Sequence, residues 1–267
     1  MALKFLCLAS GSSGNCYYLG TSDYGFLFDV GIGIRTIKKT LKDNKIDFVR
    51  ILAVFVTHDH SDHIKSVGSL NIKYQIPVYT TERIHSAIMQ SCYVDKNGYN
   101  PRTVIEKDQS VQIRDFRITA FEIPHDANDC VGYHIRFENH NVVLATDVGH
   151  INDTLIKYAG LANHLIIESN YDKDMLLEGR YPKYLKQRIM NGSGHLSNHE
   201  TAQFLATHAG SQLKNVWLCH LSRDNNRPEL AYKTVADAMR QNGIRVGEDI
   251  NLVPLQRSTP SELYIFE

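Results

Sequence analysis

Four side chains that commonly bind transition metals lie within six residues of one another. They are His58, His60, Asp62 and His63 in the string Thr57-His58-Asp59-His60-Ser61-Asp62-His63. Neutral imidazole and carboxylate groups suit zinc, manganese or iron. The string therefore predicts a metal site, and one loop with four such ligands can serve two ions.

An apolar run directly precedes this string and predicts the element that positions it. Residues Ile51-Leu52-Ala53-Val54-Phe55-Val56 are short, continuous and rich in β-branched and aromatic side chains, which is typical of a buried strand. A rigid sheet can aim ligands on the loop that leaves such a strand. The spacing of His60 and His63 suits the first turn of a helix, which we expect to follow His63.

Three further polar residues each come just past an apolar run. They are His125, Asp147 and His220. Any one of them alone could be a helix cap or a hydrogen-bonded loop residue. Because all three follow predicted strands, they favour a shared site where loops gather at one edge of a sheet.

The pattern of apolar residues predicts strands in two clusters, each followed by helices. The expected strands are Leu3–Leu8, Cys16–Leu19, Gly25–Phe28, Ile51–Val56, Ile76–Tyr79, Val111–Ile113, Phe116–Ile123, Val131–Phe137, Val142–Thr146, Leu165–Glu168 and Asn215–Cys219. The expected helices are Ile34–Leu41, Thr81–Ser91, Tyr184–Met190, Glu200–His208 and Glu229–Gln241. This order indicates two sheets with helices outside.

Composition limits the class of protein. The chain has 267 residues, 43% of them hydrophobic, which is enough for one large α/β domain over residues 1–267. Lys plus Arg and Asp plus Glu number 29 each, so no bulk positive field points to nucleic acid. Five scattered cysteines without a Cys-x-x-Cys motif favour the reducing cytoplasm. We expect no membrane span or membrane partner, because the apolar runs are too short.

The order of the polar motifs resembles the metallo-β-lactamase-fold hydrolase superfamily. The ligand pattern of that family is matched by His58-x-His60-x-Asp62-His63, His125, Asp147 and His220, and Phe26–Gly31 is similar to its first, non-ligand aspartate motif. The resemblance implies an α/β (α+β) fold, namely a four-layer αβ/βα sandwich of the metallo-β-lactamase type. It also implies two divalent metal ions as cofactors, zinc or manganese, with iron as a further option.

The same resemblance implies a role for each ligand. His58, His60 and His125 would bind one metal, Asp62, His63 and His220 the second, and Asp147 would bridge them. Asp29 would lie behind the ligands and orient the histidine loop. True β-lactamases of this fold typically lack the histidine equivalent to His63, so its presence favours the glyoxalase II or phosphodiesterase branches.

Several other motifs are similar to the YycJ branch of the superfamily, also called WalJ or VicX. They are Ser10–Cys16, Glu168-Ser169-Asn170, Gly194-His195-Leu196-Ser197-Asn198 and His220–Asn226. That branch is associated with exonuclease-like DNA cleavage. The resemblance therefore implies a phosphodiesterase or nuclease with a phosphodiester substrate, DNA among the candidates. An acyl or thioester hydrolase of the glyoxalase II type, an iron-containing redox protein and a non-catalytic binding protein are the alternatives.

Two residues are expected to act in catalysis with a metal-bridging hydroxide. Asp62 would accept the proton of the water that forms it. His195, which the resemblance places at the scissile phosphate, would stabilise the phosphate oxygens or protonate the leaving group. The expected substrate-binding residues are Ser12, Ser13, Asn15, Ser197, Arg223 and Asn226. The alternatives are a plain hairpin turn at Ser10–Asn15, a helix cap at Ser197 and a solvated arginine.

A basic strip and four tyrosines are weaker signals for a nucleic acid. Arg180, Lys183, Lys186 and Arg188 could contact a phosphate backbone, although such a run is more often a solvated helix side. Tyr93, Tyr99, Tyr171 and Tyr181 could stack on bases or pack in the core. The polymer (DNA, RNA or a small cyclic diester) and the oligomeric state stay open.

Overall fold

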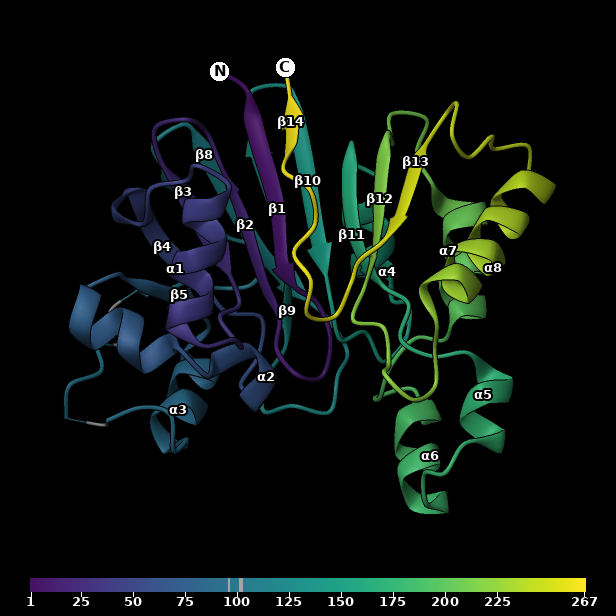
Figure 1. The fold of residues 1–267 in the computed structure, drawn as a ribbon, viewed down its shortest axis with the longest axis horizontal. Helices are drawn as coiled ribbons and strands as arrows, with labels where there is room; N and C mark the ends of the chain where they lie inside the picture. The colour runs from purple at the N-terminus through teal and green to yellow at the C-terminus, as the bar shows by residue number, and fades with distance from the viewer. Residues whose placement is uncertain (96, 101–102) are drawn as a thin grey trace. The chain divides into compact units, whose positions relative to one another are not determined.

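The computed structural model describes residues 1–95, 97–100 and 103–267. The chain forms two compact units, each of which contains one seven-stranded sheet (Figure 1). The first unit comprises residues 1–109, 127–130 and 256–267, and the second comprises residues 110–126 and 131–255. Two sheets with accompanying helices confirm the predicted α/β class.

The sheet of the first unit has the order β14-β1-β2-β3-β4-β5-β6. Its strands are β1 (Leu3–Ala9), β2 (Cys16–Gly20), β3 (Gly25–Phe28), β4 (Ile51–Phe55), β5 (Val78–Thr80), β6 (Thr103–Val104) and β14 (Tyr264–Phe266). The strands from β14 to β3 pair antiparallel, and those from β3 to β6 pair parallel. Because parallel strands end at the same edge, β3 and β4 deliver their following loops side by side.

The sheet of the second unit has the order β13-β12-β11-β10-β9-β8-β7. Its strands are β7 (Ser110–Ile113), β8 (Phe116–Glu122), β9 (Val131–Phe137), β10 (His140–Ala145), β11 (His164–Glu168), β12 (Asn215–Cys219) and β13 (Asn251–Pro254). β7 to β10 form an antiparallel meander, and β10 to β13 are parallel. The loops after β10, β11 and β12 therefore leave from one edge.

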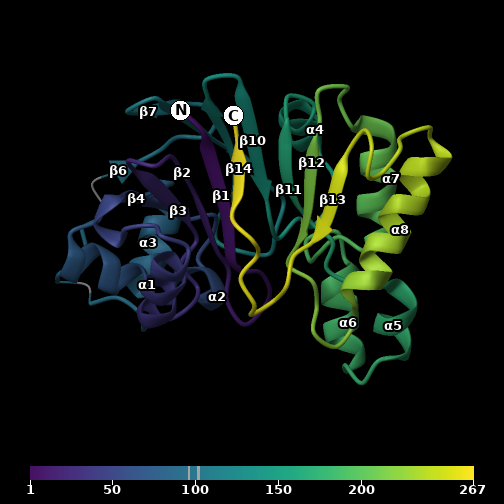
Figure 2. The ribbon, with the colours of Figure 1, turned by 45° about the horizontal axis from the view of Figure 1, so that its top comes forward.

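Each unit carries its own helices. In the first they are α1 (Ile34–Asp43), α2 (Ser61–Ile64) and α3 (Glu82–Gln90), with a 3₁₀ turn (Phe48–Arg50) and a π turn (Ser69–Lys73). In the second they are α4 (Asp153–Ala159), α5 (Lys173–Glu178), α6 (Lys183–Met190), α7 (Asn198–His208) and α8 (Pro228–Gln241). Both views show α7 and α8 lying side by side (Figures 1 and 2). In the described residues, no helix is long and apolar enough to cross a membrane.

Most predicted elements are present, but some bounds and some elements differ. The helix expected after His63 begins earlier, at Ser61, because the carbonyl of His60 accepts hydrogen bonds from the N–H groups of His63 and Ile64. The strand expected at Ile76–Tyr79 is β5, which starts at Val78. β6, β13, β14, α4 and α5 were not predicted from the sequence. Each has seven residues or fewer, and β14 pairs with β1 at the opposite end of the chain.

Candidate metal centre

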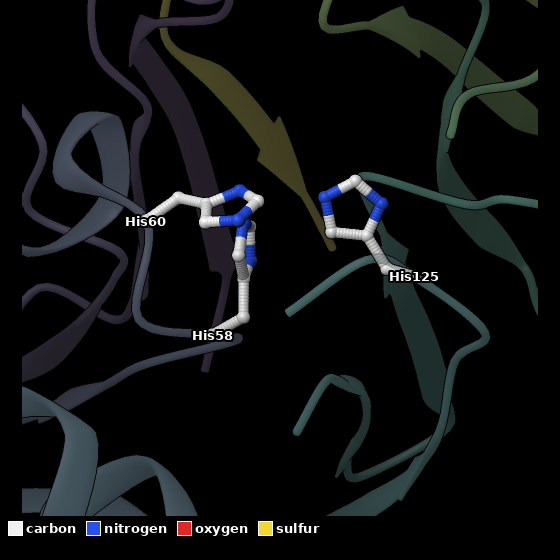
Figure 3. A group of neighbouring side chains, drawn as sticks. All are labelled: His58, His60 and His125. Carbon is white, nitrogen blue, oxygen red and sulfur yellow. The ribbon is translucent and has the colours of Figure 1, made fainter. Parts of the chain in front are cut away.

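The loop after β4 brings the predicted ligands of the first unit together. The ring centroids of His58 and His60 lie 4.6 Å apart, and those of His58 and His63 lie 4.0 Å apart. Figure 3 draws His58 and His60 with their rings against each other. Asp62 Oδ2 lies 3.6 Å from His63 Nε2. All four members of the string thus present their donor atoms from one loop.

Asp29, just past the end of β3, orients this loop. Its carboxylate accepts hydrogen bonds from the Thr57 N–H (2.8 Å), the Thr57 hydroxyl (2.9 Å) and His63 Nδ1 (2.7 Å). Both the Asp29 and His63 side chains are fully buried. Because Nδ1 of His63 donates to Asp29, the lone pair of the ring lies on Nε2, which accepts from the Asn15 amide in this structure and would turn to a metal when one is bound. Asp29 therefore has the orienting geometry that the resemblance implies.

Close backbone packing fixes the same loop. The Asp62 carbonyl accepts from the Asn15 N–H at 2.7 Å, and the His63 carbonyl accepts from the Val30 N–H at 2.8 Å. Gly31 faces this contact, since a Cβ built on it would lie 1.6 Å from the Asp62 carbonyl oxygen. Only a residue without a side chain allows the ligand loop to approach so closely.

Asp147 is the centre of a second cluster, in the second unit. Its Oδ1 lies 3.8 Å from His125 Nε2, 3.6 Å from His220 Nε2 and 3.7 Å from His195 Nδ1. These separations exceed hydrogen-bond lengths. Two donor atoms that bind the same tetrahedral zinc ion, each at about 2.1 Å, lie roughly 3.4 Å apart. The distances from Asp147 Oδ1 to Nε2 of His125 and to Nε2 of His220 therefore each fit a pair of donors to one metal ion.

The second ring nitrogen of His125 and of His220 is held by the protein. His125 Nδ1 donates to the Gly194 carbonyl at 2.9 Å (Figure 3 draws its ring). His220 Nδ1 lies 3.1 Å from Glu168 Oε1, which can only accept when ionised. These contacts direct the Nε2 atoms of His125 and His220 toward Asp147. Histidines that bind metals typically donate their second N–H in this way.

Strained backbone accompanies these side chains. Asp29, Asp147 and His220 adopt φ values of 54°, 54° and 53°, in the left-handed region that non-glycine residues rarely occupy. Each of them directly follows a strand or lies two residues or fewer past its end. Such strain persists where the surrounding structure overdetermines it, and it is common at functional sites.

Glu168, the last residue of β11, joins two histidines of the second cluster. Its Oε1 lies 2.8 Å from His195 Nδ1 and 3.1 Å from His220 Nδ1, while Oε2 accepts from the N–H groups of Val148 and Leu196. Burial alone would raise the pKa of Glu168, but the charge and hydrogen bonds of the two imidazoles outweigh it and hold that pKa below its ordinary value. Glu168 is thus a buried carboxylate that positions two rings.

His195 differs from the other members of the cluster in being accessible. Its side chain is 21% exposed, compared with 3% or less for Asp147, His220 and His125. Burial opposes its charged form, but the neighbouring Glu168 and Asp147 carboxylates raise the pKa of His195 above its ordinary value. An accessible imidazole that favours protonation can contact a substrate anion.

The predicted substrate-binding residues fall into two groups. Ser12, Ser13 and Arg223 are exposed. Asn15, Ser197 and Asn226 are buried and form hydrogen bonds within the protein. The Asn15 amide donates to His63 Nε2 at 2.9 Å, and Ser197 caps α7 by a capping box with Glu200. The Asn226 amide donates to the Ser169 and Asn170 carbonyls. The first group can meet a ligand directly, whereas the second group supports the loops around the ligands.

Glu168, Thr57 and Gly194 have supporting contacts that were not predicted from the sequence. In the sequence, Glu168 is part of the Glu168-Ser169-Asn170 motif that is similar to the YycJ branch. Its spacing from other residues does not distinguish it from an ordinary carboxylate at the end of a strand. The role of Glu168 follows from the position of β11 between β10 and β12. This strand order places Glu168 beside His195 and His220, which lie 27 and 52 positions further along the chain.

Comparison with known proteins identifies the family. A model of the beta-lactamase superfamily domain matches residues 24–220. The chain belongs to the beta-lactamase superfamily. Among curated superfamily relatives, exodeoxyribonuclease WalJ of Streptococcus pneumoniae is 34% identical, with 98% of each chain covered. Exodeoxyribonuclease YycJ of Bacillus anthracis is 32% identical over 98% of this chain and 99% of the relative.

A solved structure confirms the fold within this superfamily. The metallo-beta-lactamase fold protein YhfI from Bacillus subtilis matches with a TM-score of 0.71, covering 99% of this chain and 100% of that chain at 20% identity. The predicted fold type is therefore correct. Together with the His and Asp clusters, membership of the beta-lactamase superfamily makes the protein a metal-dependent hydrolase.

Proposed function

We propose that this protein is a DNA nuclease that depends on two divalent metal ions and cleaves from a DNA end as an exonuclease. The observation that carries the proposal is the second-unit cluster, in which Asp147 faces the nitrogens of three histidines and only His195 is accessible. Such a cation beside the metals would help to hydrolyse a phosphodiester, because negative charge develops on the phosphate oxygens. The names of the two full-length relatives support DNA as the substrate.

In this proposal residues 1–267 act as one metallo-β-lactamase-like domain, and the two ligand sets serve the same pair of ions. As in the family pattern, His58, His60 and His125 would hold one metal, Asp62, His63 and His220 would hold the other, and Asp147 would be a ligand of both. Zinc and manganese suit these nitrogen and carboxylate donors, and iron does so as well. When bound, the ions would lower the pKa of a water and neutralise the phosphate.

The protein's own groups have separate tasks around the reacting phosphate. Asp62 is proposed to accept the proton of the attacking water. His195 is proposed to approach the phosphate through Nε2, because its Nδ1 is held by Glu168. From there it can donate a proton to the leaving oxygen. Glu168 keeps that ring in one orientation and favours its charged form.

Direct contacts to the substrate are proposed for the exposed residues of the predicted set. Ser12 and Ser13 offer hydroxyls on the turn after β1, and Arg223 offers a guanidinium fork that suits phosphate. Asn15, Ser197 and Asn226 would contribute by fixing the loops that carry the ligands. A cytoplasmic location is also proposed, since all five cysteines are thiols rather than disulfides, which suits a reducing compartment.

One experiment tests this function against its main competitor. Manganese- and zinc-loaded protein is incubated with end-labelled DNA, end-labelled RNA, bis-p-nitrophenyl phosphate and a thioester, beside an Asp62→Ala control. We expect DNA and the small diester to be cleaved by the wild type and not by the control. Turnover of the thioester alone would instead assign the protein to the acyl hydrolases.

A further inference from the structure

Helix α6 is a surface helix without a buried residue, and it leads directly into the second cluster. Its exposed residues are Lys183, Tyr184, Gln187 and Arg188, which form one stripe because they are spaced at i, i+1, i+4 and i+5. The Tyr184 ring is 72% exposed, the most of any aromatic residue among the described large hydrophobics. A stripe that exposes an aromatic ring between cations requires an explanation other than packing.

We infer that this stripe of α6 binds the DNA strand that extends from the metal centre, with Lys183 on the backbone and Tyr184 stacked on a base. The inference rests on the proposed function, whose substrate it places on a defined surface. Sequence-independent binding of single strands combines cations that follow the backbone with aromatic rings on which bases stack. The stripe offers both within one helix.

Local charge supports a polyanionic partner. No acidic residue occurs between Gly179 and His199, whereas Arg180, Lys183, Lys186 and Arg188 all fall in that stretch. The chain as a whole has no net charge, so this surplus is local. Lys186 donates to the Leu177 carbonyl of α5, and Arg188 pairs with Asp126. Arg180 and Lys183 are therefore the cations most available to a ligand.

Covalent and hydrogen-bonded links tie α6 to the catalytic residues. The N–H of His195 donates to the Ile189 carbonyl at 3.0 Å, and Arg188 holds the residue after His125. The helix rises about 1.5 Å per residue, so Lys183 lies roughly 7.5 Å beyond Arg188 along the axis. That distance is about two nucleotide steps at 3.4 Å each. A strand that starts at His195 can therefore follow α6 for a few nucleotides.

The test compares two matched double variants in the second unit. Lys183→Ala/Tyr184→Ala removes the proposed contacts, and Tyr232→Ala/Lys233→Ala removes the same residue types from the exposed side of α8. Binding of a fluorescein-labelled single-stranded DNA is measured by anisotropy at several salt concentrations, and turnover of bis-p-nitrophenyl phosphate serves as the check on folding and on the metal centre.

We expect the α6 variant to bind DNA about tenfold more weakly than the wild type and to turn over the small diester normally. The slope of log binding constant against log salt concentration should become shallower by roughly one unit, as expected for the loss of one phosphate contact. The α8 variant should match the wild type in both assays. Equal DNA affinity of the α6 variant and the wild type would overturn the inference. If the wild type bound DNA through α6 but hydrolysed neither DNA nor the diester, the inference would stand and the proposed nuclease activity would be wrong.

Discussion

At the scale of single residues, the account depends on histidines whose two nitrogens have different partners. His63 and His125 each give Nδ1 to a protein acceptor, Asp29 and the Gly194 carbonyl respectively. The residue types at the metal site could be predicted because imidazole and carboxylate groups cluster by chemistry. Their tautomers could not, since the acceptors come from other strands and loops.

His195→Ala tests the residue assigned to the phosphate. Because His195 is the accessible imidazole of its cluster and is not among the proposed ligands, we expect diester turnover to fall about 100-fold to 10,000-fold while metal content stays unchanged. Turnover and metal content are measured on the same preparation. His199→Ala, an exposed histidine on α7, is the control and should behave as wild type. Full activity of His195→Ala with both metals bound would remove it from the mechanism.

Asp29→Asn tests orientation of the ligand loop. The amide keeps the shape of Asp29 but cannot accept from all three of its donors, so the His63 ring loses its fixed position. We expect metal affinity to fall about 10-fold to 100-fold, measured by calorimetric titration of the metal-free protein. Asp23→Asn, a surface carboxylate in the same unit, provides the comparison. Unchanged affinity in Asp29→Asn would mean that the contact does not serve the metal.

At the scale of elements, the strands that carry the site were the easiest to predict. β3 and β12, which Asp29 and His220 follow, have the bounds expected from the sequence, because continuous apolar runs form buried strands. β14 is different: it has three residues and exists because it pairs with β1 at the opposite end of the chain. A local pattern carries no information about such a partner.

Gly31→Ala tests how β3 and α2 pack around the ligands. An added Cβ would overlap the Asp62 carbonyl, so the ligand loop must move. We expect a loss of about 3 kcal/mol or more in the free energy of unfolding, measured by urea denaturation. At Gly33 no atom lies within 4 Å of an added Cβ, so Gly33→Ala should change stability by less than about 0.5 kcal/mol. Equal stability of the two variants would contradict the packing described here.

We predict that the free energy of unfolding depends on pH through His164, which lies at the edge of the second sheet where β10 and β11 begin. Burial, with a smaller contribution from His140 at 3.1 Å, lowers the pKa of His164 from 6.5 to about 4. The unfolded chain therefore binds a proton at His164 more readily than the folded chain does. The contribution of neutral His164 to the free energy of unfolding is fully present above pH 6.5 and is lost as the pH falls toward 4. The loss amounts to at most about 3 kcal/mol.

Urea denaturation across this pH range measures the effect. His164→Gln should flatten the profile, because the glutamine does not titrate, whereas His208→Gln, at an exposed position on α7, should leave the slope as in wild type. A profile of equal slope in wild type and His164→Gln would show that another group is responsible. The sequence alone does not predict this shift, since His164 looks like any histidine at the start of a strand.

At the scale of the whole molecule, charge and ligands are distributed unevenly along a chain of zero net charge. The first unit contains one histidine-rich loop, and the second contains the other candidate ligands and His195 on four loops, together with the basic stripe of α6. The ligand pattern of the family could be predicted from the order of the motifs along the chain, because that order does not depend on the number of residues between them. The supporting contacts of Glu168, Asn15 and Asn226 could not, because they depend on strand order within each sheet.

The proposal on which the others depend is that ligands from both units bind the same pair of ions. Anomalous diffraction from crystals of the manganese-loaded protein tests it most directly. The account predicts two manganese peaks, one bonded to His58, His60 and His125, the other to Asp62, His63 and His220, with Asp147 on both at roughly 2.1 Å. Peaks that leave His125, Asp147 and His220 unligated would contradict the account.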